Sequence, residues 1–286
     1  MAKGALIGRG RTAEIFELGK GRVLKLYFDF IPREAVEREL AGTRAATRAG
    51  IRAPTVYGLE REEGRIGLVM ERLGGESLLD RIARRPAEAF EAVSLLADLH
   101  AAMRRSGPEP DLPRLRAALA SGIERAVGLL EPEKDEILAR LDLLPDGESI
   151  CHGDLHPGNI LMTPEGPVVI DWMSASRGRA IGDLARTELL LATGGLPEGI
   201  PIAAKAAVAA ARAALAKLYV RRYFKAASGS ASENLAAWRL PVLAARLFEL
   251  NSYPSERRAV LGRIRAELRR PYLAGASESK ATPPRS

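Results

Sequence analysis

The sequence predicts an α+β chain, with a small β-rich N-terminal part that carries one helix and a larger, mainly helical C-terminal part. Two observations predict this division. Short alternating or apolar runs bounded by Gly or Pro account for most of the chain before Met70. From Glu76 onward, apolar residues recur at three- and four-residue spacing through one segment after another. With 286 residues and 47% hydrophobic content, the chain can bury a substantial core, in one large domain or in two lobes.

The first predicted element is a hairpin that contains glycines. Residues 7–16 read Ile-Gly-Arg-Gly-Arg-Thr-Ala-Glu-Ile-Phe, a G-x-G-x-x-A pattern between two strand-like runs. The strand continues to Leu18 without opening a helix, and no Gly-Lys-Ser/Thr follows, which argues against a dinucleotide-binding βαβ unit and against a Walker loop. Glycines let a backbone close over phosphate groups where a Cβ would collide. We therefore interpret this hairpin as a cover for phosphates.

A strand and a helix follow the hairpin. In residues 22–27, Lys25 shares a face with Val23, while Leu24 and Leu26 lie on the other face. Taken alone, Lys25 is most simply an exposed strand lysine. The helix is predicted to begin after Pro32, which suits a first-turn position, and to run to about Ala49.

The predicted helix offers three glutamates that could hold Lys25: Glu34, Glu37 and Glu39. At about 100° per residue, its inner stripe is formed by Val36, Leu40, Thr43 and Thr47. Glu37 falls on a shoulder with Arg33, Arg44 and Arg48, where solvated ion pairs are the natural role. Glu39 falls on the opposite shoulder, beside Ala35, Thr43 and Ala46. Of the three, Glu39 is therefore the best placed to meet Lys25, a pairing that the resemblance described below implies.

The rest of the chain is predicted as two strands, a connecting segment and a series of helices. The strands are residues 55–57 and 65–70, and the pattern then breaks at residues 70–75, as a hinge should. The expected helices are residues 77–84, 87–103, 114–130, 133–141, 183–192, 202–225, 233–250 and 256–268. His100 in the second helix is expected to be structural. Asp183 is expected to cap its helix and to support the loop described next.

The most informative stretch is residues 152–161, His-Gly-Asp-Leu-His-Pro-Gly-Asn-Ile-Leu, with Val-Val-Ile-Asp-Trp at 168–172. It presents Asp154, Asn159 and Asp171 in the order that phosphoryl transfer uses, with one Asp near the acceptor hydroxyl and an Asn and a second Asp for metal ions. The apolar runs 160–162 and 168–170 predict a hairpin that fixes these side chains.

Two other interpretations of this stretch exist. Asp, Asn, Gly and Pro also form ordinary turns. His152 and His156 are four residues apart, as in some zinc sites, but Pro157 and Gly158 argue against the helix that such a pair needs.

The spacing of five from Asp154 to Asn159 is that of the protein-kinase catalytic loop, with Gly153 in place of the usual Arg and Asp171-Trp172 in place of Asp-Phe-Gly. Over residues 4–270 the chain resembles the aminoglycoside phosphotransferase and choline kinase-like family, which tolerates Ala13 where protein kinases have a third Gly. The resemblance implies a two-lobed protein-kinase-like fold. Its expected parts are an ATP-binding lobe at 1–71, a catalytic and acceptor-binding lobe at 72–274, and a disordered tail at 275–286.

The resemblance also implies a role for each candidate residue. Mg-ATP would bind between the lobes, with Asp154 positioning the acceptor hydroxyl and with Asn159 and Asp171 holding Mg²⁺. The remaining nucleotide contacts would come from Gly8, Gly10 and Thr12 over the phosphates, Lys25 held by Glu39, and Met70, Glu71 and Leu73 at the adenine.

The charge distribution bears on the acceptor. The net charge is +7, and residues 172–270 carry 17 Lys and Arg against 7 Asp and Glu. A polycationic acceptor calls for clustered carboxylates, and this region offers only Asp183, Glu188, Glu198, Glu233 and Glu249 as the main candidates. We therefore expect a neutral or anionic small molecule with a hydroxyl group. An aminoglycoside or amino-alcohol acceptor stays open, because the arginines could all lie on solvated helix faces.

Other classes of function are weaker. A pI of about 9.7 is typical of nucleic-acid binding, but aromatic content is only 5% and the basic residues are dispersed, so no nucleic-acid partner is expected. A protein kinase or a nucleotide-binding pseudokinase stays an alternative, although no Ala-Pro-Glu element follows Asp171. The single cysteine and the lack of an N-terminal apolar segment predict a cytoplasmic protein, and charges within residues 202–220 argue against a membrane span.

Overall fold

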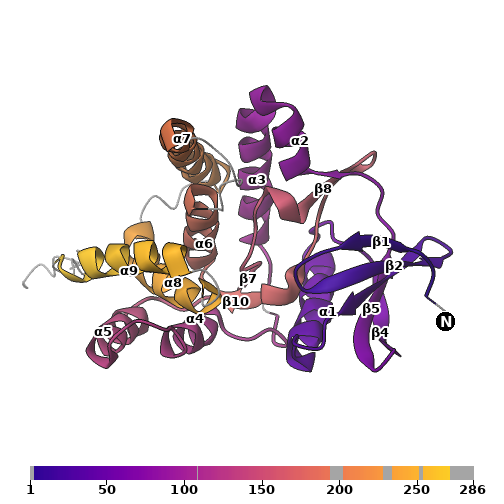
Figure 1. Cartoon of the computed structure of the whole chain (residues 1–286), viewed down its shortest axis with the longest axis horizontal. Coiled ribbons are helices and arrows are strands. Elements are labelled where there is room, and N and C mark those ends of the chain that lie inside the picture. The colour runs from indigo at the N-terminus through magenta and orange to yellow at the C-terminus, as the bar shows by residue number, and fades with distance from the viewer. Residues whose placement is uncertain (1–2, 108, 194–201, 228–233, 251–253, 271–286) are drawn as a thin grey trace, which may run out of the picture.

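The computed structural model describes residues 3–107, 109–193, 202–227, 234–250 and 254–270 (Figure 1). It consists of a β-sheet region that carries one helix, followed by a larger helical region, as the sequence predicts. The tail expected at 275–286 lies outside the described residues.

The N-terminal region is a five-stranded antiparallel sheet in the order β1-β2-β3-β5-β4. Its strands are β1 (Leu6–Arg9), β2 (Ala13–Gly19), β3 (Arg22–Tyr27), β4 (Val56–Glu62) and β5 (Arg65–Glu71). The predicted hairpin is the β1–β2 pair. The prediction for β4 was too short, since this strand extends to Glu62 through its pairing with β5.

Helix α1 (Arg33–Arg48) is the one helix of this region, and it lies against the sheet (Figure 1). Its buried face is centred on Glu39, Gly42, Thr43 and Ala46. The predicted inner stripe is therefore partly wrong: Thr47 is exposed and Leu40 is only half-buried. The reason is that α1 packs on two surfaces, the sheet and the segment after Asp171, and the second one rotates the buried face toward Gly42.

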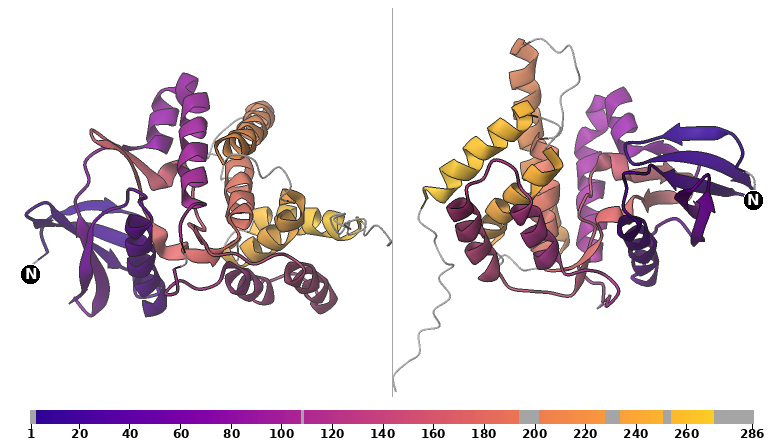
Figure 2. Two further views of the ribbon diagram at one scale, coloured as in Figure 1. Left: turned by 180° about the vertical axis from the view of Figure 1, so that it is seen from behind. Right: turned by 60° about the horizontal axis from the view of Figure 1, so that its bottom comes forward.

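The C-terminal region packs its helices around one large apolar core that includes Leu96, Trp172, Tyr219 and Trp238 (Figure 2). Its helices are α2 (Leu78–Arg84), α3 (Ala89–Met103), α4 (Leu115–Glu124), α5 (Glu131–Asp142), α6 (Ala180–Thr193), α7 (Ile202–Ala226), α8 (Leu235–Arg246) and α9 (Pro254–Leu268). Two predicted helices are shorter than expected. The helix expected at 114–130 ends at Glu124, before Gly128 with its φ of 99°, and the one expected at 233–250 passes into a 3₁₀ turn, η4 (Leu247–Leu250).

The remaining elements are short strands and 3₁₀ turns, several of which flank Asp154 and Asp171 in the chain. They are β6 (Glu76–Ser77), β7 (Ser149–Cys151), β8 (Ile160–Thr163), β9 (Gly166–Val169), β10 (Ser176–Gly178), η1 (Pro86–Glu88), η2 (Pro157–Asn159) and η3 (Trp172–Ser174). The predicted hairpin of 160–162 and 168–170 is the β8–β9 pair, and β6 adds to it from the connecting segment. The chain thus places the Asp154–Asp171 stretch where the two regions meet.

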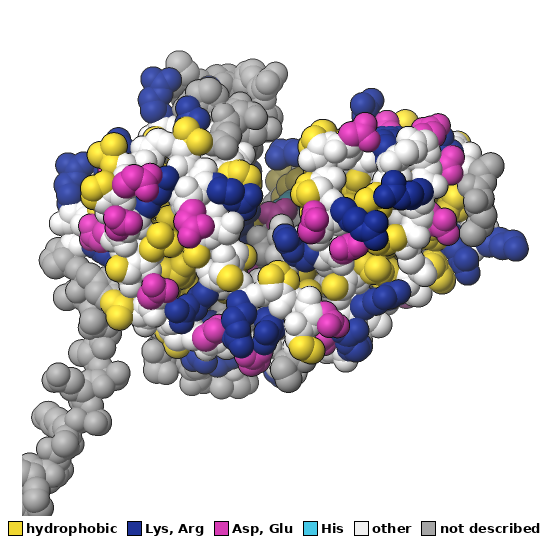
Figure 3. All heavy atoms as spheres, turned by 90° about the horizontal axis from the view of Figure 1, so that it is seen from below, with side chains coloured by type: hydrophobic (Ala, Val, Ile, Leu, Met, Phe, Trp, Pro, Cys, Tyr) yellow, Lys and Arg dark blue, Asp and Glu magenta, His cyan; other side chains and the backbone are white. Residues whose placement is uncertain are grey.

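Seen from below, a furrow separates the sheet region from the helical region (Figure 3). On this face, basic side chains alternate with acidic ones rather than forming one continuous patch. Among the described helices, none is long and apolar enough to cross a membrane.

Candidate functional site

The loop that carries Asp154 is held in place by a buried carboxylate of α6. Asp183 in α6 accepts hydrogen bonds from the backbone N–H groups of His152 (2.7 Å) and Gly153 (2.9 Å). Its side chain is fully buried. Asp183 was predicted to cap its helix; this is wrong, because α6 begins three residues earlier at Ala180. The expected support of the loop is confirmed, since two buried backbone donors would otherwise lack a partner.

Behind Asp183, a buried histidine completes the support. His100 Nε2 lies 3.1 Å from the Asp183 carboxylate, and its Nδ1 contacts the Tyr219 hydroxyl of α7. Burial by itself raises the pKa of Asp183, but His100, His152 and the Gly153 N–H together bring that pKa below its ordinary value. Asp183 is therefore charged, and the expected structural role of His100 is confirmed.

The two histidines of the loop are engaged in holding its backbone. His152 Nδ1 accepts from the Asp154 N–H (3.2 Å), and its Nε2 donates to the Ile170 carbonyl (3.0 Å). His156 Nδ1 accepts from the Gly158 N–H at 3.0 Å. Both nitrogens of His152 are therefore occupied, and no cluster of three metal-ligating His, Cys, Asp or Glu occurs in the described part of the chain. The zinc interpretation of this pair has no support here.

Gly153 occupies a position that an arginine could not fill. Its φ is +78°, a region that side chains rarely adopt, and a Cβ there would lie 2.4 Å from the Ser174 carbonyl oxygen. The departure from the protein-kinase pattern at this residue thus has a local steric cause: the loop passes close to the segment after Asp171.

Asp154, Asn159 and Asp171 are brought together by the hairpin. Asn159 Nδ2 donates to the Asp154 carbonyl at 2.9 Å and lies 3.5 Å from its carboxylate. The Asn159 carbonyl accepts a hydrogen bond from the Ile170 N–H at 3.0 Å. Because Asp171 follows Ile170 directly, this bond brings Asp171 close to Asn159. Asp171 adopts φ 65° and ψ 62°, a left-handed conformation that is uncommon for a residue with a side chain and that clusters at functional sites.

Asp171 meets the lysine of the sheet region. Lys25 Nζ lies 3.0 Å from Asp171 Oδ1 and donates to both Glu39 oxygens, at 2.6 and 2.8 Å. Tyr27 donates to the Glu39 carboxylate at 2.5 Å. The expected choice of Glu39 is confirmed, and Glu37 pairs with Arg33 on the exposed face as expected. Tyr27 was not foreseen, although it shares the strand face of Lys25 at a spacing of two.

Lys25 and Asp171 each favour the charged form of the other. Burial lowers the pKa of Lys25, but Glu39 and Asp171 outweigh it and raise that pKa above its ordinary value. Burial raises the pKa of Asp171, but Lys25, His152 and His156 together lower it below its ordinary value. The result is a cation and a carboxylate held charged at the junction of the two regions.

The other residues predicted to contact the nucleotide lie in the strands of the sheet or directly beside them. Gly8 and Gly10 lie at the tip of the β1–β2 hairpin, and a Cβ at either would meet no heavy atom closer than 3.6 Å. The Thr12 carbonyl accepts from the Phe28 N–H at 2.9 Å. Met70 and Leu73, at the end of β5 and just beyond it, are half-buried. The Glu71 N–H donates to the Thr55 carbonyl at 2.8 Å.

An arginine that the sequence analysis missed lies beside Asp154. Arg186 in α6 donates through Nε to the Gly153 carbonyl at 3.1 Å, and its Nη2 lies 3.6 Å from Asp154 Oδ1. The same Nη2 donates to Glu249 Oε2 of η4 at 2.7 Å. Arg246, at the end of α8, lies 3.9 Å from that oxygen. The available signal was the spacing of three from Asp183, which places Arg186 on the same face of its helix.

The site brings together two carboxylates, an amide and a buried lysine: Asp154, Asp171, Asn159 and Lys25. Such a set is suited to a metal-bound phosphate chain.

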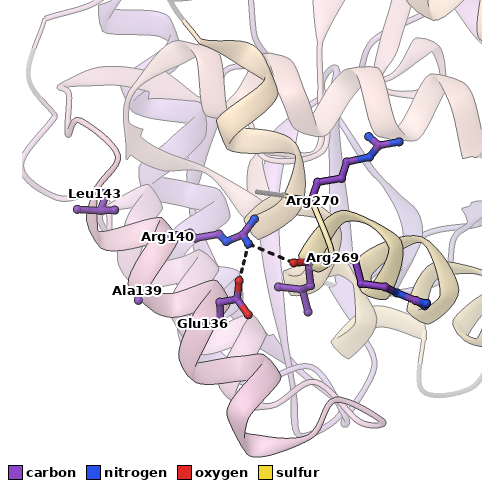
Figure 4. A pocket seen from close by; sticks show the side chains of 7 residues that line it. Glu136, Ala139, Arg140, Leu143, Arg269 and Arg270 are labelled. Atoms are coloured by element: carbon purple, nitrogen blue, oxygen red, sulfur yellow. Dashed lines mark hydrogen bonds and ion pairs between the residues drawn. The ribbon is translucent and has the colours of Figure 1, made fainter. Parts of the chain in front are cut away.

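A hollow of about 590 Å³ between α5 and α9 is a separate feature (Figure 4). It is lined by Glu136, Arg140, Leu143 and the end of α9. Arg140 contacts Glu136 on its own helix and reaches across to the Leu268 carbonyl of α9.

Comparisons with known proteins agree with the fold. A choline/ethanolamine kinase family protein from Mesorhizobium loti is 17% identical, with a TM-score of 0.59 over 93% of this chain and 88% of that one. A thermostable aminoglycoside phosphotransferase variant in complex with ADP and hygromycin B is 16% identical, with a TM-score of 0.62 over 93% and 92%. Amicoumacin kinase in complex with AMP-PNP, Ca²⁺ and Ami is 13% identical, with a TM-score of 0.62 over 92% and 87%. No curated protein matches.

The fold is thus the two-lobed protein-kinase-like fold of these enzymes, with a small β-rich N-terminal lobe and a larger helical C-terminal lobe. A family model described as the phosphotransferase enzyme family matches residues 3–219. The chain belongs to this family and is a kinase by class.

Proposed function

We propose that the protein transfers the γ-phosphate of Mg-ATP to a hydroxyl group of a neutral or anionic small molecule. The observation that carries the proposal is the contact of Lys25 with Asp171 at the junction of the lobes, on the same hairpin that holds Asp154 and Asn159. The lobes are proposed to be residues 1–71 and 72–274, so that the nucleotide binds where they meet.

Lys25 is the proposed phosphate-binding cation. Its contact with Glu39 fixes the ammonium group inside the lobe junction, and its pKa is raised, so it stays charged at neutral pH. The glycines of the β1–β2 hairpin support the same role. Because the protein itself leaves room for a Cβ at Gly8 and Gly10, the absence of side chains there is better explained by a close ligand, with Thr12 beside it.

The adenine would contact Met70, Glu71 and Leu73 where β5 leaves the sheet. The Glu71 N–H is already bonded to Thr55, which limits the contribution of its backbone to the carbonyl group. Met70 and Leu73 would supply apolar contact, as half-buried residues at the edge of the lobe junction.

Asn159 and Asp171 fit a magnesium ion. Mg²⁺ prefers oxygen ligands and binds through one or two carboxylates together with substrate phosphates. The Asp171 side chain is about a third exposed (34%), and Lys25 keeps it ionised. When bound, the ion would bridge the phosphates and neutralise the charge that develops on them.

Asp154 is proposed to orient the acceptor hydroxyl and to accept its proton. Its carboxylate is partly exposed, and its backbone is fixed by Asn159 and by His152. Arg186 Nη2, 3.6 Å from Asp154 Oδ1, positions the carboxylate.

Three of the five acidic residues expected to be available for a cationic acceptor, Asp183, Glu188 and Glu249, are already engaged. Asp183 holds the loop, Glu188 is paired with both prongs of Arg239 at 2.7 and 2.8 Å, and Glu249 is paired with Arg186. Glu198 and Glu233 lie outside the described residues. A neutral or anionic acceptor therefore suits the site better than a polycationic one.

The protein is proposed to work in the cytoplasm, because its single cysteine leaves no internal disulfide.

Cys151 is fully buried, and burial, with Asp183 nearby, raises the pKa of its thiol well above the ordinary value. Cys151 therefore packs as a small apolar residue next to the loop and does not act as a nucleophile.

The test is ADP release by the purified protein with Mg-ATP across a panel of sugars, sugar acids, nucleosides, amino alcohols and aminoglycosides. Asp154→Asn is the matched variant, since it keeps the shape of the side chain and removes the base. An acceptor that supports turnover in the wild type and not in the variant, with ATP binding kept by both, supports the proposal. Binding of Mg-ATP without any acceptor would favour a pseudokinase, and no nucleotide binding would contradict the whole assignment.

A further inference from the structure

Arg246 is a largely buried cation whose guanidinium group makes no hydrogen bond to any described residue. The residue is only 9% exposed, and within the described part of the chain its one ion-pair partner is Glu249 Oε2, at 3.9 Å. That oxygen already accepts a 2.7 Å hydrogen bond from Arg186. A guanidinium group presents five donors, and no Arg246 nitrogen is among the fully enclosed side-chain atoms that lack a partner, so its donors are open to a ligand from the site. Such a group calls for a ligand.

The position of Arg246 links it to the site of phosphoryl transfer. Arg186, Glu249 and Arg246 form a continuous chain of contacts that begins at Asp154. Burial and then the charge of Arg186 lower the pKa of Arg246, while Glu249, Glu256 and Asp154 raise it. Both arginines therefore act electrostatically on one small region beside the Asp154 carboxylate.

We propose that Arg246, assisted by Arg186, binds an oxyanion of the acceptor, a carboxylate or a phosphate monoester, while Asp154 binds the hydroxyl group. The acceptor is then a small hydroxy acid or a phosphorylated hydroxy compound. This inference rests on the proposed function, since it specifies the substrate of the same site.

The chemistry of the two groups fits this division. A guanidinium group binds carboxylate and phosphate through two parallel hydrogen bonds, which fixes orientation as well as affinity. Glu249 is already bonded to Arg186, so Arg246 is the cation with donors to spare. A cationic acceptor would meet two like charges here, and like-charge juxtaposition suppresses wrong partners.

The experiment compares acceptors in matched pairs: glycerate with glycerol, gluconate with glucose, and glycerol 3-phosphate with glycerol. Binding to protein saturated with Mg-AMP-PNP is measured by calorimetry, and ADP release with Mg-ATP is measured alongside. The charged member of at least one pair is expected to bind about tenfold or more better than its neutral counterpart. Which pair responds distinguishes a carboxylate from a phosphate.

Arg246→Gln is expected to lose about tenfold to a hundredfold of that affinity, as for a hydrogen bond to a charged group, and to leave the neutral compound unaffected. Arg263→Gln removes one positive charge from an exposed position on α9 and should change nothing. Arg246→Lys keeps the charge but not the two-pronged geometry, and should retain part of the affinity. It serves as the test if Arg246→Gln shows no cooperative melting.

Three outcomes overturn the inference: neutral members preferred throughout, no binding by any charged member, or an Arg246→Gln variant that keeps the preference for the anion. In each of them, Mg-AMP-PNP binding by the wild type would leave the proposed function standing. Failure of the wild type to bind the nucleotide would instead remove the proposed function, and this inference with it.

Discussion

At the scale of single residues, the geometry of Asp154 depends on groups from different elements. Asn159 donates to its carbonyl, His152 accepts from its N–H, and Arg186 approaches its carboxylate. Asn159 and His152 are recognisable as parts of a motif, because both lie on the same loop as Asp154. Arg186 comes from α6 and becomes a neighbour only after the C-terminal lobe has folded.

Arg186→Met should lower kcat by about tenfold to a hundredfold, since small displacements of a positioned group cost rates of that order. Arg186 contacts Gly153, Asp154 and Glu249, none of them a proposed nucleotide residue, so the KM for ATP should stay within about threefold of the wild-type value. Steady-state ADP release with saturating acceptor measures both constants. Arg186→Lys, which keeps the charge near Asp154, should recover part of kcat. An unchanged kcat in Arg186→Met would show that the arginine has no part in positioning Asp154.

At the scale of elements, the contact between α1 and η3 joins the lysine side of the site to the metal side. Glu39 and Gly42 lie on one face of α1, and η3 begins directly after Asp171. A Cβ on Gly42 would lie 2.5 Å from Ala175 Cβ and 3.0 Å from the Trp172 carbonyl oxygen. The close approach of this helix to η3 is therefore made possible by a glycine.

Gly42→Ala should destabilise the protein by about 1–3 kcal/mol, because overpacking outweighs the better helix propensity of alanine. It should also lower kcat, since α1 carries the partner of Lys25. Gly262→Ala in α9 is the control: no heavy atom lies within 4 Å of its Cβ position, so it should stabilise by up to about 1 kcal/mol. Urea unfolding measures both, and equal effects of the two changes would show that the contact tolerates a methyl group.

Asp183 joins three further elements, since α6 holds the loop after β7 and His100 of α3. Asp183→Asn should cost about 3 kcal/mol at neutral pH, because an amide cannot accept from both backbone donors and loses the charge beside His100. The pKa of Asp183 is lowered in the folded state. Its contribution is therefore complete above the unfolded pKa of about 3.9 and is lost as pH falls through the folded value.

The difference in unfolding free energy between wild type and Asp183→Asn should accordingly stay constant from pH 7 to about pH 5 and shrink below about pH 4. Urea titrations at several pH values give this difference directly. A gap that widens as the pH falls would mean that Asp183 is protonated in the folded protein.

At the scale of the whole molecule, local sequence patterns predicted the two-part architecture and much of the site. The resemblance to kinases supplied the idea that Lys25 is held by a glutamate, and helical periodicity was then enough to choose Glu39 over Glu37, because it depends on local sequence alone. The buried face of α1 was predicted only in part, since its packing against η3 depends on residues more than a hundred positions away in the chain. Arg246 was missed for the same reason: nothing local distinguishes it from the other arginines of the C-terminal lobe, and only packing buries it.

Because Lys25 belongs to one lobe and Asp171 to the other, a ligand bound between them should stabilise the molecule as a unit. Mg-AMP-PNP at a hundred times its Kd should add about 2.7 kcal/mol, which corresponds to a rise in Tm of about 5–10 °C for a chain of this size. Removing Mg²⁺ with EDTA should abolish most of that rise, since the phosphates and Asp171 would then repel each other. Asp171→Ala should show the same small rise with or without Mg²⁺ and should have no Mg-dependent ATP turnover. A full magnesium-dependent rise in this variant would place the metal on other ligands and contradict the role of Asp171.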